Sequence, residues 1–544
     1  MTEYGAWMIG FALIYTLLLI IAGNVARVKA SSGSNFFVGG RNFRWWTVAF
    51  CITGLFSGST YISIVELSYL TGISAIWYGI AETVQVLIIA LLMIKSFRKR
   101  MMVTVSGLIG DQFGRAAKGI AGLITAFAFP MWSVATAIAF ASALNVFTNI
   151  SLSVSIAFTA ILLFIYLQAG GMWSVAFTQT MNSTVFLSMF IIGTIAFFIN
   201  PGIEGLVQLA QTNPSMFHFD AVGIQVIVAW FGTFLVNVIL AQAAFQMALS
   251  CRTPEEGQKG VIGAVFLGIP FIICGILFGL AAAIVIPGET LGLVALPKYL
   301  MEVLPAPLVG LFFLGIWACA LSWGAPCQFS GATSLGKDVG SAIFPNTTSI
   351  QLVHYTKLSL LLLTGLMIIF GLLRTEQSAW WNVLAWTTRN AATFAPVVAA
   401  LFWPVVTKHA VVSSLLTGFV TGLLWYHLGG WQPTVFFLDI HPVWIGMSTN
   451  VLTIISVTLL TNYRNIQVSL KNHSIKDYLA VYFSVVLAIS TVVFFKLLHE
   501  LGLLGLLGFS TIVTLFLTII LFVREKREVQ YYSQTANVPI DQMQ

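Results

Sequence analysis

Long apolar stretches alternate with short polar connections along almost the whole chain. Each stretch has about 18 to 30 residues, and a helix of that length crosses the hydrocarbon core of a bilayer, which is about 30 Å thick. The pattern therefore predicts an all-α polytopic membrane protein with about fifteen transmembrane helices. The expected spans are 7–28, 45–71, 75–95, 117–147, 152–169, 173–198, 222–247, 259–286, 306–333, 355–373, 380–405, 411–428, 440–461, 478–496 and 503–523.

The positions of the basic residues test this assignment of spans and loops, because Lys and Arg accumulate in cytoplasmic loops. Of the 25 lysines and arginines, all but four fall in one set of alternate loops. Lys298, Arg374 and Lys496 lie in the opposite loops, and Arg389 lies inside a span. The sequence therefore predicts a multi-pass protein of the cell membrane, with its N-terminus outside and its C-terminus in the cytoplasm.

Composition supports the membrane assignment, since 58% of the 544 residues are hydrophobic and only 8% are charged. The net charge of +7 comes from short basic clusters between apolar runs, which set topology. Membrane lipid is thus an expected partner and nucleic acid is not. The five cysteines show no metal-ligand spacing.

Motifs of the common enzyme classes are missing from the sequence. It has no G-x-x-x-x-G-K-[ST] phosphate loop and no H-E-x-x-H pair, and its seven histidines are scattered. The connections are also too short to hold a soluble catalytic domain. We therefore expect no enzyme, while transporter, channel and sensor all remain open on these grounds.

Four segments carry a family resemblance. They read FFVGGRNFRWW at 36–46, GGMWSV at 170–175, FQMALSCRTPEE at 245–256 and FAPVVAALFW at 394–403. In this order, and on the expected sides of the membrane, they resemble characteristic segments of the sodium:solute symporter family. The resemblance extends over about residues 36–405.

The resemblance implies a LeuT-type fold within one transmembrane transporter domain, residues 1–544. Two inverted repeats of five helices are expected at 45–198 and 222–405, flanked by 1–44 and by 406–544. In such folds, substrate and ion sites lie near the membrane midplane where helices are interrupted.

The function implied is secondary active transport of a small polar organic solute, such as a carboxylate or an amino acid, by alternating access. Sodium is the expected coupling ion, and no cofactor is expected besides it. Two alternatives remain open. One is a proton-coupled or uncoupled transporter, and the other is a sensor or receptor that keeps the fold without transport. The oligomeric state does not follow from the sequence.

An expected helix break at residues 53–60, TGLFSGST, carries the implied sodium site. Matched to the family, the backbone carbonyls of Thr53 and Phe56 become ligands, together with a hydroxyl of the span 306–333. Oxygen ligands suit a hard cation such as sodium. Small residues at 53–60 are also explained by close helix packing alone.

The ion site departs from the family pattern at several positions. The matched positions on the span 306–333 are Cys319, Ser322 and Trp323, and only Ser322 offers a normal oxygen ligand. Gln179 stands where the family usually has an aspartate, and Leu55 stands where some members have a polar residue. We therefore expect any sodium dependence to be weak.

The implied substrate site combines Ser57, Ser59 and Thr60 with Arg389. A guanidinium in a span suits bidentate recognition of a carboxylate. Arg389 could instead form a structural ion pair with Glu66 or Glu82, or serve as a fixed cation in place of sodium, because a charge at that depth needs a partner.

Overall fold

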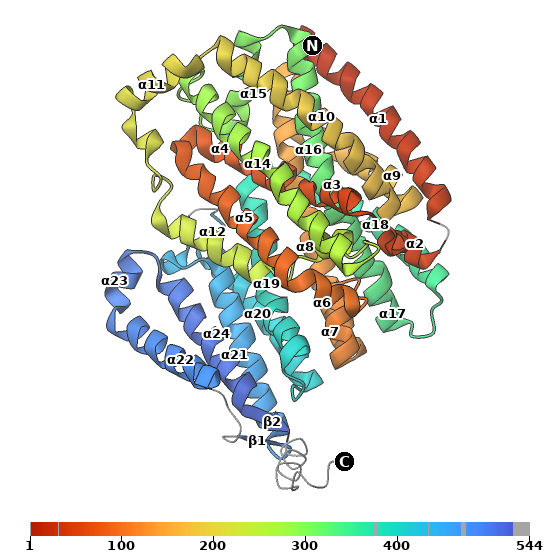
Figure 1. Ribbon diagram of the computed structural model, residues 1–544, viewed down its shortest axis with the longest axis vertical. Helices are drawn as coiled ribbons and strands as arrows, with labels where there is room; N and C mark the ends of the chain where they lie inside the picture. Colours follow the sequence, from red (N-terminus) through yellow and green to blue (C-terminus); the bar gives the residue numbers. More distant parts are fainter. Residues whose placement is uncertain (1, 31, 375–377, 433–434, 469–474, 526–544) are drawn as a thin grey trace. The chain divides into compact units, whose positions relative to one another are not determined.

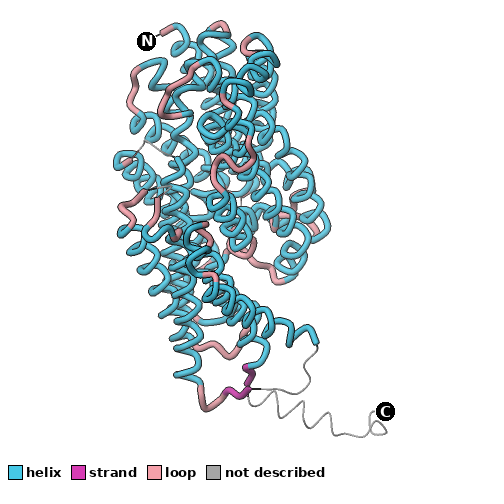
Figure 2. Tube along the Cα trace, turned by 90° about the vertical axis from the view of Figure 1, so that its left-hand side faces the viewer, coloured by secondary structure: helices cyan, strands magenta, loops and turns pink. Residues whose placement is uncertain are grey.

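The structure is a computed structural model that describes residues 2–30, 32–374, 378–432, 435–468 and 475–525 (Figure 1). The expected cytoplasmic tail after residue 525 lies outside these ranges. Helices make up nearly all of the described chain, and one short antiparallel pair of strands, drawn in magenta in Figure 2, is the only sheet in it. The prediction of an all-α polytopic membrane protein is confirmed.

The chain forms two compact units. The first unit comprises residues 1–107 and 122–385. Its elements are α1 (Glu3–Lys29), α2 (Gly33–Val38), η1 (Gly39–Arg41), α3 (Trp45–Leu55), η2 (Phe56–Thr60), α4 (Tyr61–Thr71), η3 (Gly72–Ala75), α5 (Ile76–Ile88), η4 (Ile89–Met93), α6 (Ile94–Lys99), most of α8 (Arg115–Thr148), α9 (Leu152–Gly170), α10 (Met172–Ile199), α11 (Gly202–Thr212), η5 (Pro214–Phe217), α12 (Ile224–Asn237), α13 (Gln242–Ala248), α14 (Pro254–Val285), α15 (Gly292–Val303), α16 (Ala306–Thr333), η6 (Ser334–Val339), α17 (Gly340–Ile343) and α18 (Ser349–Leu373).

The second unit comprises residues 108–121 and 386–544. Its elements are most of α7 (Val105–Phe113), most of α19 (Ser378–Phe402), α20 (Lys408–Leu428), η7 (Phe437–Asp439), α21 (Pro442–Asn462), β1 (Ile466–Val468), α22 (Ile475–Val493), α23 (Phe495–Glu500), α24 (Leu504–Phe522) and β2 (Val523–Glu525). Within it, α20 packs along α21, and α24 packs against α21 and α22. The buried Asn450 of α21 joins three helices, because its amide donates to the carbonyls of Ala392 and Ser414 and its oxygen accepts from the Ala395 N–H.

Helix α16 forms the centre of the first unit, and almost every one of its residues is buried. It packs against α1, α10, α18 and η2, while α14 lies along α3 and α4. Peripheral helices show the opposite pattern. On α1, for example, Leu13, Ile14 and Leu17 are exposed. Large apolar side chains on the outside are what a lipid-facing surface requires.

Helices lie at all fifteen expected ranges, although their number as membrane spans is not confirmed. Among the described residues, 11 helices are long and apolar enough to cross a membrane, or up to 12 if one bent pair counts as a single span. One of these helical runs, Trp45–Lys99, is 55 residues long and covers two expected spans. The bent pair is α12 with α13, which meet at an angle of 49°.

Two of the segments that carry the family resemblance meet in space. The Arg41 guanidinium donates to the carbonyls of Leu249, Met101 and Met102, and Phe43 forms an isolated parallel bridge with Cys251. Burial, together with the nearby Arg98, lowers the pKa of Arg41 to about 10. Part of the sequence pattern at 36–46 and 245–256 is therefore explained by these two loops packing against each other and satisfying each other's backbone groups.

A third motif forms the turn between α9 and α10. Gly171 has a φ of 54° there, a left-handed value that favours glycine. A Cβ atom at this position would lie 2.6 Å from the Phe36 carbonyl oxygen. The Gly-Gly pair therefore lets α2 approach this turn closely.

Candidate functional site

The first expected core helix is continuous where a break was expected. Residues 56–60 form the π-helical segment η2, which joins α3 to α4 with helical backbone angles at both junctions. The expectation of an interrupted helix was therefore wrong in form, although the irregularity lies at the expected residues. A π turn adds one residue to a turn and shifts the hydrogen-bond pattern, which is why it often marks functional sites.

Both carbonyls implied as sodium ligands sit at this π segment. The Thr53 carbonyl accepts from the Phe56 N–H, and the Phe56 carbonyl accepts from the Tyr61 N–H. A carbonyl oxygen has two lone pairs, so it can accept a hydrogen bond and also face a cation. Their side chains are engaged elsewhere, since the Thr53 hydroxyl donates to the Ala49 carbonyl at 2.8 Å and the Phe56 ring packs over Gly268.

Ser322 and Trp323 of α16 lie against the end of α3 and against η2. A Cβ atom on Gly54 would lie 2.5 Å from the Ser322 carbonyl oxygen, and one on Gly58 would lie 2.2 Å from the Cβ of Trp323. The two glycines therefore allow α16 to touch α3 and η2. The structure thus brings Thr53, Phe56 and Ser322 into one neighbourhood, while their role as sodium ligands stays a prediction.

A further side chain, Gln179 of α10, enters the same neighbourhood. Its Nε2 donates to the Ser322 carbonyl oxygen at 2.5 Å and to the Cys51 carbonyl oxygen at 3.4 Å. In return, the Ser322 hydroxyl donates to Gln179 Oε1. The family resemblance placed Gln179 among the departures at the ion site, and the structure adds its direct contact with Ser322, which is 143 positions away.

This contact continues as a buried chain of neutral polar groups, which we call the Gln179 network: Tyr15, Asn182, Gln179, Ser322 and the Cys51 carbonyl. Asn182 Nδ2 donates to Gln179 Oε1 at 3.4 Å, and the Tyr15 hydroxyl donates to Asn182 Oδ1 at 2.5 Å. All four of its side chains are buried. The network therefore links α1, α10, α16 and α3 without a formal charge.

The expected substrate hydroxyls share the π segment. Ser57 and Thr60 are buried and Ser59 is half-buried. The Ser57 hydroxyl makes a long hydrogen bond of 3.4 Å to the Gly54 carbonyl, and no described residue hydrogen-bonds the Thr60 hydroxyl. A buried hydroxyl without a protein partner is a candidate ligand position.

The expected guanidinium lies in the other unit. Arg389 of α19 is buried, and its Nε and Nη2 donate to Asn390 Oδ1 at 3.1 and 2.9 Å. Glu66 of α4 and Glu82 of α5 belong to the first unit. The joint site of Ser57, Ser59, Thr60 and Arg389 therefore stays a prediction, as does the ion pair of Arg389 with either glutamate.

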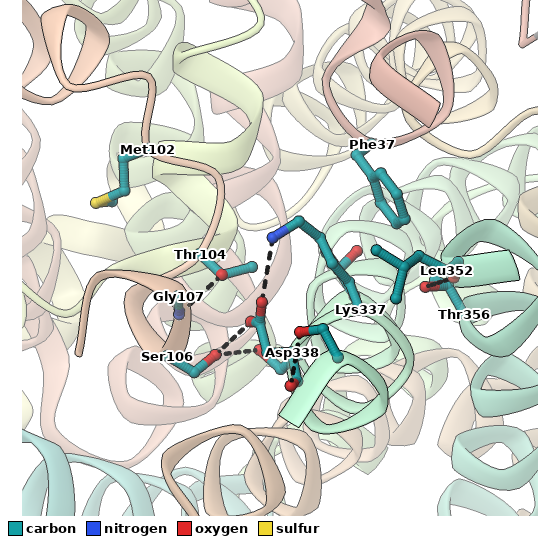
Figure 3. A network of polar contacts seen from close by, with 12 residues as sticks. Phe37, Met102, Thr104, Ser106, Gly107, Lys337, Asp338, Leu352 and Thr356 are labelled. Carbon is teal, nitrogen blue, oxygen red and sulfur yellow. Dashed lines mark hydrogen bonds and ion pairs between the residues drawn. The ribbon is translucent and has the colours of Figure 1, made fainter. Parts of the chain in front are cut away.

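Figure 3 shows a second polar cluster, centred on Asp338 of η6. The buried Asp338 carboxylate accepts from the Ser106 hydroxyl at 2.7 Å and lies 3.2 Å from the Lys337 ammonium. Ser106 also contacts Ser334, and Ser334 accepts from Gln242 Nε2 of α13 at 2.8 Å. This cluster ties the start of α7 to α13 of the bent pair and to η6, which follows α16.

Neither cluster has the composition of a transition-metal site. In the ranges that the structure describes, no group of three or more His, Cys, Asp and Glu side chains is placed to hold a metal ion. The groups near η2 are carbonyls, hydroxyls and carboxamides. Such neutral oxygen donors fit a hard monovalent cation better than a soft metal.

Comparison with known proteins agrees with this geometry. The sodium:solute symporter family matches residues 36–418. The chain is 24% identical over 369 residues to High-affinity choline transporter 1 of Torpedo marmorata, covering 62% of each chain. It is 22% identical over 438 residues to the Sodium/pantothenate symporter of Haemophilus influenzae, covering 77% of this chain and 90% of the relative.

Among solved structures, a Na+-coupled sialic acid symporter in a substrate-bound, outward-open state has a TM-score of 0.69 and 18% identity. The match covers 85% of this chain and 98% of that one, and it shows that the fold is of the LeuT type. The chain spans less than two thirds of the choline transporter's length. From the match over residues 36–418, the chain belongs to the sodium:solute symporter family.

Proposed function

We propose that this protein is a secondary active transporter that moves a small polar organic solute across the cell membrane by alternating access, coupled to sodium. Family membership and the LeuT-type fold support this function, and an enzyme is not expected in such a family. The observation that carries the proposal is the packing of Ser322 against the end of α3 and of Trp323 against the π segment η2. An irregular helix facing a hydroxyl-bearing helix is where transporters of this type hold ions and solutes.

For the coupling ion, the proposed ligands are the carbonyls of Thr53 and Phe56 and the hydroxyl of Ser322. Each carbonyl oxygen has two lone pairs, and Ser322 is buried against Gly54 of the same stretch. Cys319 and Trp323 add no oxygen from their side chains. A sodium shell here is therefore poor in side-chain ligands, which supports weak binding of the ion.

For the solute, the proposed contacts are Ser57, Ser59, Thr60 and Arg389. The unsatisfied hydroxyl of Thr60 and the fork of donors on Arg389 suit a solute with a carboxylate and further polar groups. Relatives of this chain bear the names of transporters for choline, glucose, monocarboxylate and pantothenate. The names cover several solute classes, so they support small organic solutes in general.

Proton-coupled transport is the second candidate. Glu82 is buried on α5, and no described residue hydrogen-bonds its Oε2. A carboxylate in that state is costly inside a membrane unless it takes up a proton or a cation. Uncoupled transport, or a sensor that keeps the fold without transport, would be distinguished by the same experiment.

Uptake by purified protein in proteoliposomes tests the proposal, with a panel of carboxylates, amino acids and sugars. Each solute is assayed with an inward sodium gradient, with an inward proton gradient and with neither. We expect one solute class to accumulate above equilibrium only with the inward sodium gradient, and by a modest factor. Accumulation with a proton gradient alone would favour the second candidate. Binding of a solute without uptake under any gradient would overturn the transport assignment.

A further inference from the structure

The carboxamide of Gln179 fills the space between α3 and α16, next to the proposed sodium ligands. Its Nε2 faces two backbone carbonyls, Cys51 O at 3.4 Å and Ser322 O at 2.5 Å. Carbonyl oxygens only accept hydrogen bonds, so the nitrogen end of the amide must point at them. The positive end of a neutral dipole therefore lies where an oxygen-lined gap would otherwise attract a cation.

The rest of the network holds the amide in this orientation. The hydroxyl of Ser322 and Asn182 Nδ2 both donate to Gln179 Oε1. Turning the amide over would bring its oxygen against the two carbonyls and its nitrogen against Asn182 Nδ2, so three hydrogen bonds would be lost, and the Ser322 hydroxyl would have to turn round to accept the fourth. Ser322 is thus held twice by Gln179, through its carbonyl and through its hydroxyl.

We propose that Gln179 is a built-in competitor of the coupling ion. Its Nε2 already donates to the carbonyl oxygens of Cys51 and Ser322, next to the proposed ligands, so a sodium ion gains these two oxygens only by displacing the carboxamide. If the carboxamide stays in place, the positive end of its dipole opposes the ion, although the Ser322 hydroxyl keeps its lone pairs. The inference deepens the proposed sodium-coupled transport and rests on it. It explains the expected weak sodium dependence by one residue, because Gln179 already hydrogen-bonds carbonyl oxygens beside the site before any ion binds.

The isosteric change Gln179→Glu tests this directly. It keeps the length of the side chain, removes both amide donors, and sets a carboxylate beside the carbonyls of Cys51 and Ser322. These oxygens repel one another unless a cation lies between them. We expect the variant to melt below the wild type in potassium chloride, and to recover in sodium chloride of equal ionic strength. The sodium concentration that gives half of the maximal rise in melting temperature should be about tenfold or more below that of the wild type, because the new contact is charge-assisted.

Asn182→Asp is the matched control. It is also isosteric, adds the same charge to the same network, and lies one turn farther along α10 without facing the two carbonyls. We expect no specific recovery in sodium for this variant. If both variants respond to sodium alike, the added charge alone explains the effect and the competitor role is overturned.

A variant with a smaller side chain at position 179 tests the same inference if Gln179→Glu does not fold. Gln179→Ala removes the competitor without adding charge, and it should still raise the apparent sodium affinity measured by thermal shift. An unchanged affinity would overturn the inference. Solute uptake is measured on the same preparations. If the wild type takes up solute but neither Gln179→Glu nor Gln179→Ala changes the apparent sodium affinity, the competitor role alone is refuted. If the variants change the sodium affinity but the protein neither binds nor takes up any solute, the transport function alone is refuted.

Discussion

At the scale of single residues, buried polar groups in this protein fall into two kinds. Gln179 and Asn450 use their amides fully, and each holds helices together. Thr60, Glu82 and Gln85 are buried too, yet each has a polar atom that no described residue hydrogen-bonds. Satisfied groups explain packing, whereas unsatisfied ones need a ligand, a proton or a water to remain buried at an acceptable cost.

Arg389 gives a prediction at this scale. If its guanidinium binds a solute carboxylate, Arg389→Lys keeps the charge but loses the bidentate fork. The apparent affinity for the solute should then fall while the melting temperature in detergent stays near that of the wild type. Uptake kinetics in proteoliposomes, measured beside thermal melting, check both parts of this expectation.

The ion-pair alternative predicts a different result for Arg389→Gln. Removing the partner of a buried carboxylate costs about 3 to 5 kcal/mol, so this variant would melt well below the wild type. Adding Glu82→Gln or Glu66→Gln would then restore stability. Such a rescue would contradict the role in solute binding, whereas near-wild-type melting of Arg389→Gln supports it.

At the scale of helices, glycines decide how closely α16 approaches the π segment. Gly54 and Gly58 lie on the face that meets Ser322 and Trp323, and neither has room for a methyl group. The stretch 53–60 also contains the π segment and most of the expected ligand positions. The same short stretch therefore allows the close approach of α16 and has the irregular backbone.

Gly54→Ala tests this packing. Its Cβ would lie 2.5 Å from the Ser322 carbonyl oxygen and 2.7 Å from Gln179 Nε2. Overpacking of this kind typically costs about 1 to 3 kcal/mol, so the melting temperature in detergent should fall clearly. Gly365→Ala on α18 is the control, because a Cβ there meets no atom within 4 Å. Equal melting of the two variants would show that α16 does not approach α3 this closely.

At the scale of the whole molecule, the expected membrane orientation gives a prediction that can be tested. The connection around α11 is expected outside and the start of α14 inside, with one expected span between them. This orientation follows from the distribution of basic residues alone.

Cysteine labelling tests the orientation. Gln208 on α11 and Glu255 at the start of α14 are both exposed. In intact cells, an impermeant thiol reagent should label Gln208→Cys and leave Glu255→Cys unlabelled until the membrane is permeabilised. The half-buried Cys274 is replaced by serine in the background, since the other four cysteines are buried. Labelling of Glu255→Cys in intact cells would invert the proposed topology.

The sequence by itself determined the helical architecture and the family. A chain that crosses lipid must satisfy its backbone hydrogen bonds within each helix, so long apolar runs have few other outcomes. The short family motifs could also be recognised in the sequence, because residues such as Arg41 and Gly171 lie in turns and loops. The stretch 53–60 was found for the same reason, since its composition is unusual for a helix.

Only the tertiary structure decided what those residues contact. The hydrophobic pattern shows that a helix is buried but not which partner it meets. The family resemblance placed Gln179 and Ser322 at one site, but their hydrogen bonds appear only in the structure. Likewise, the composition of 53–60 favours an irregular helix, whereas the choice between a break and a π turn depends on the packing of α14 and α16 around it. Side chains from distant segments fix that packing, and with it the chemistry of the proposed ion site.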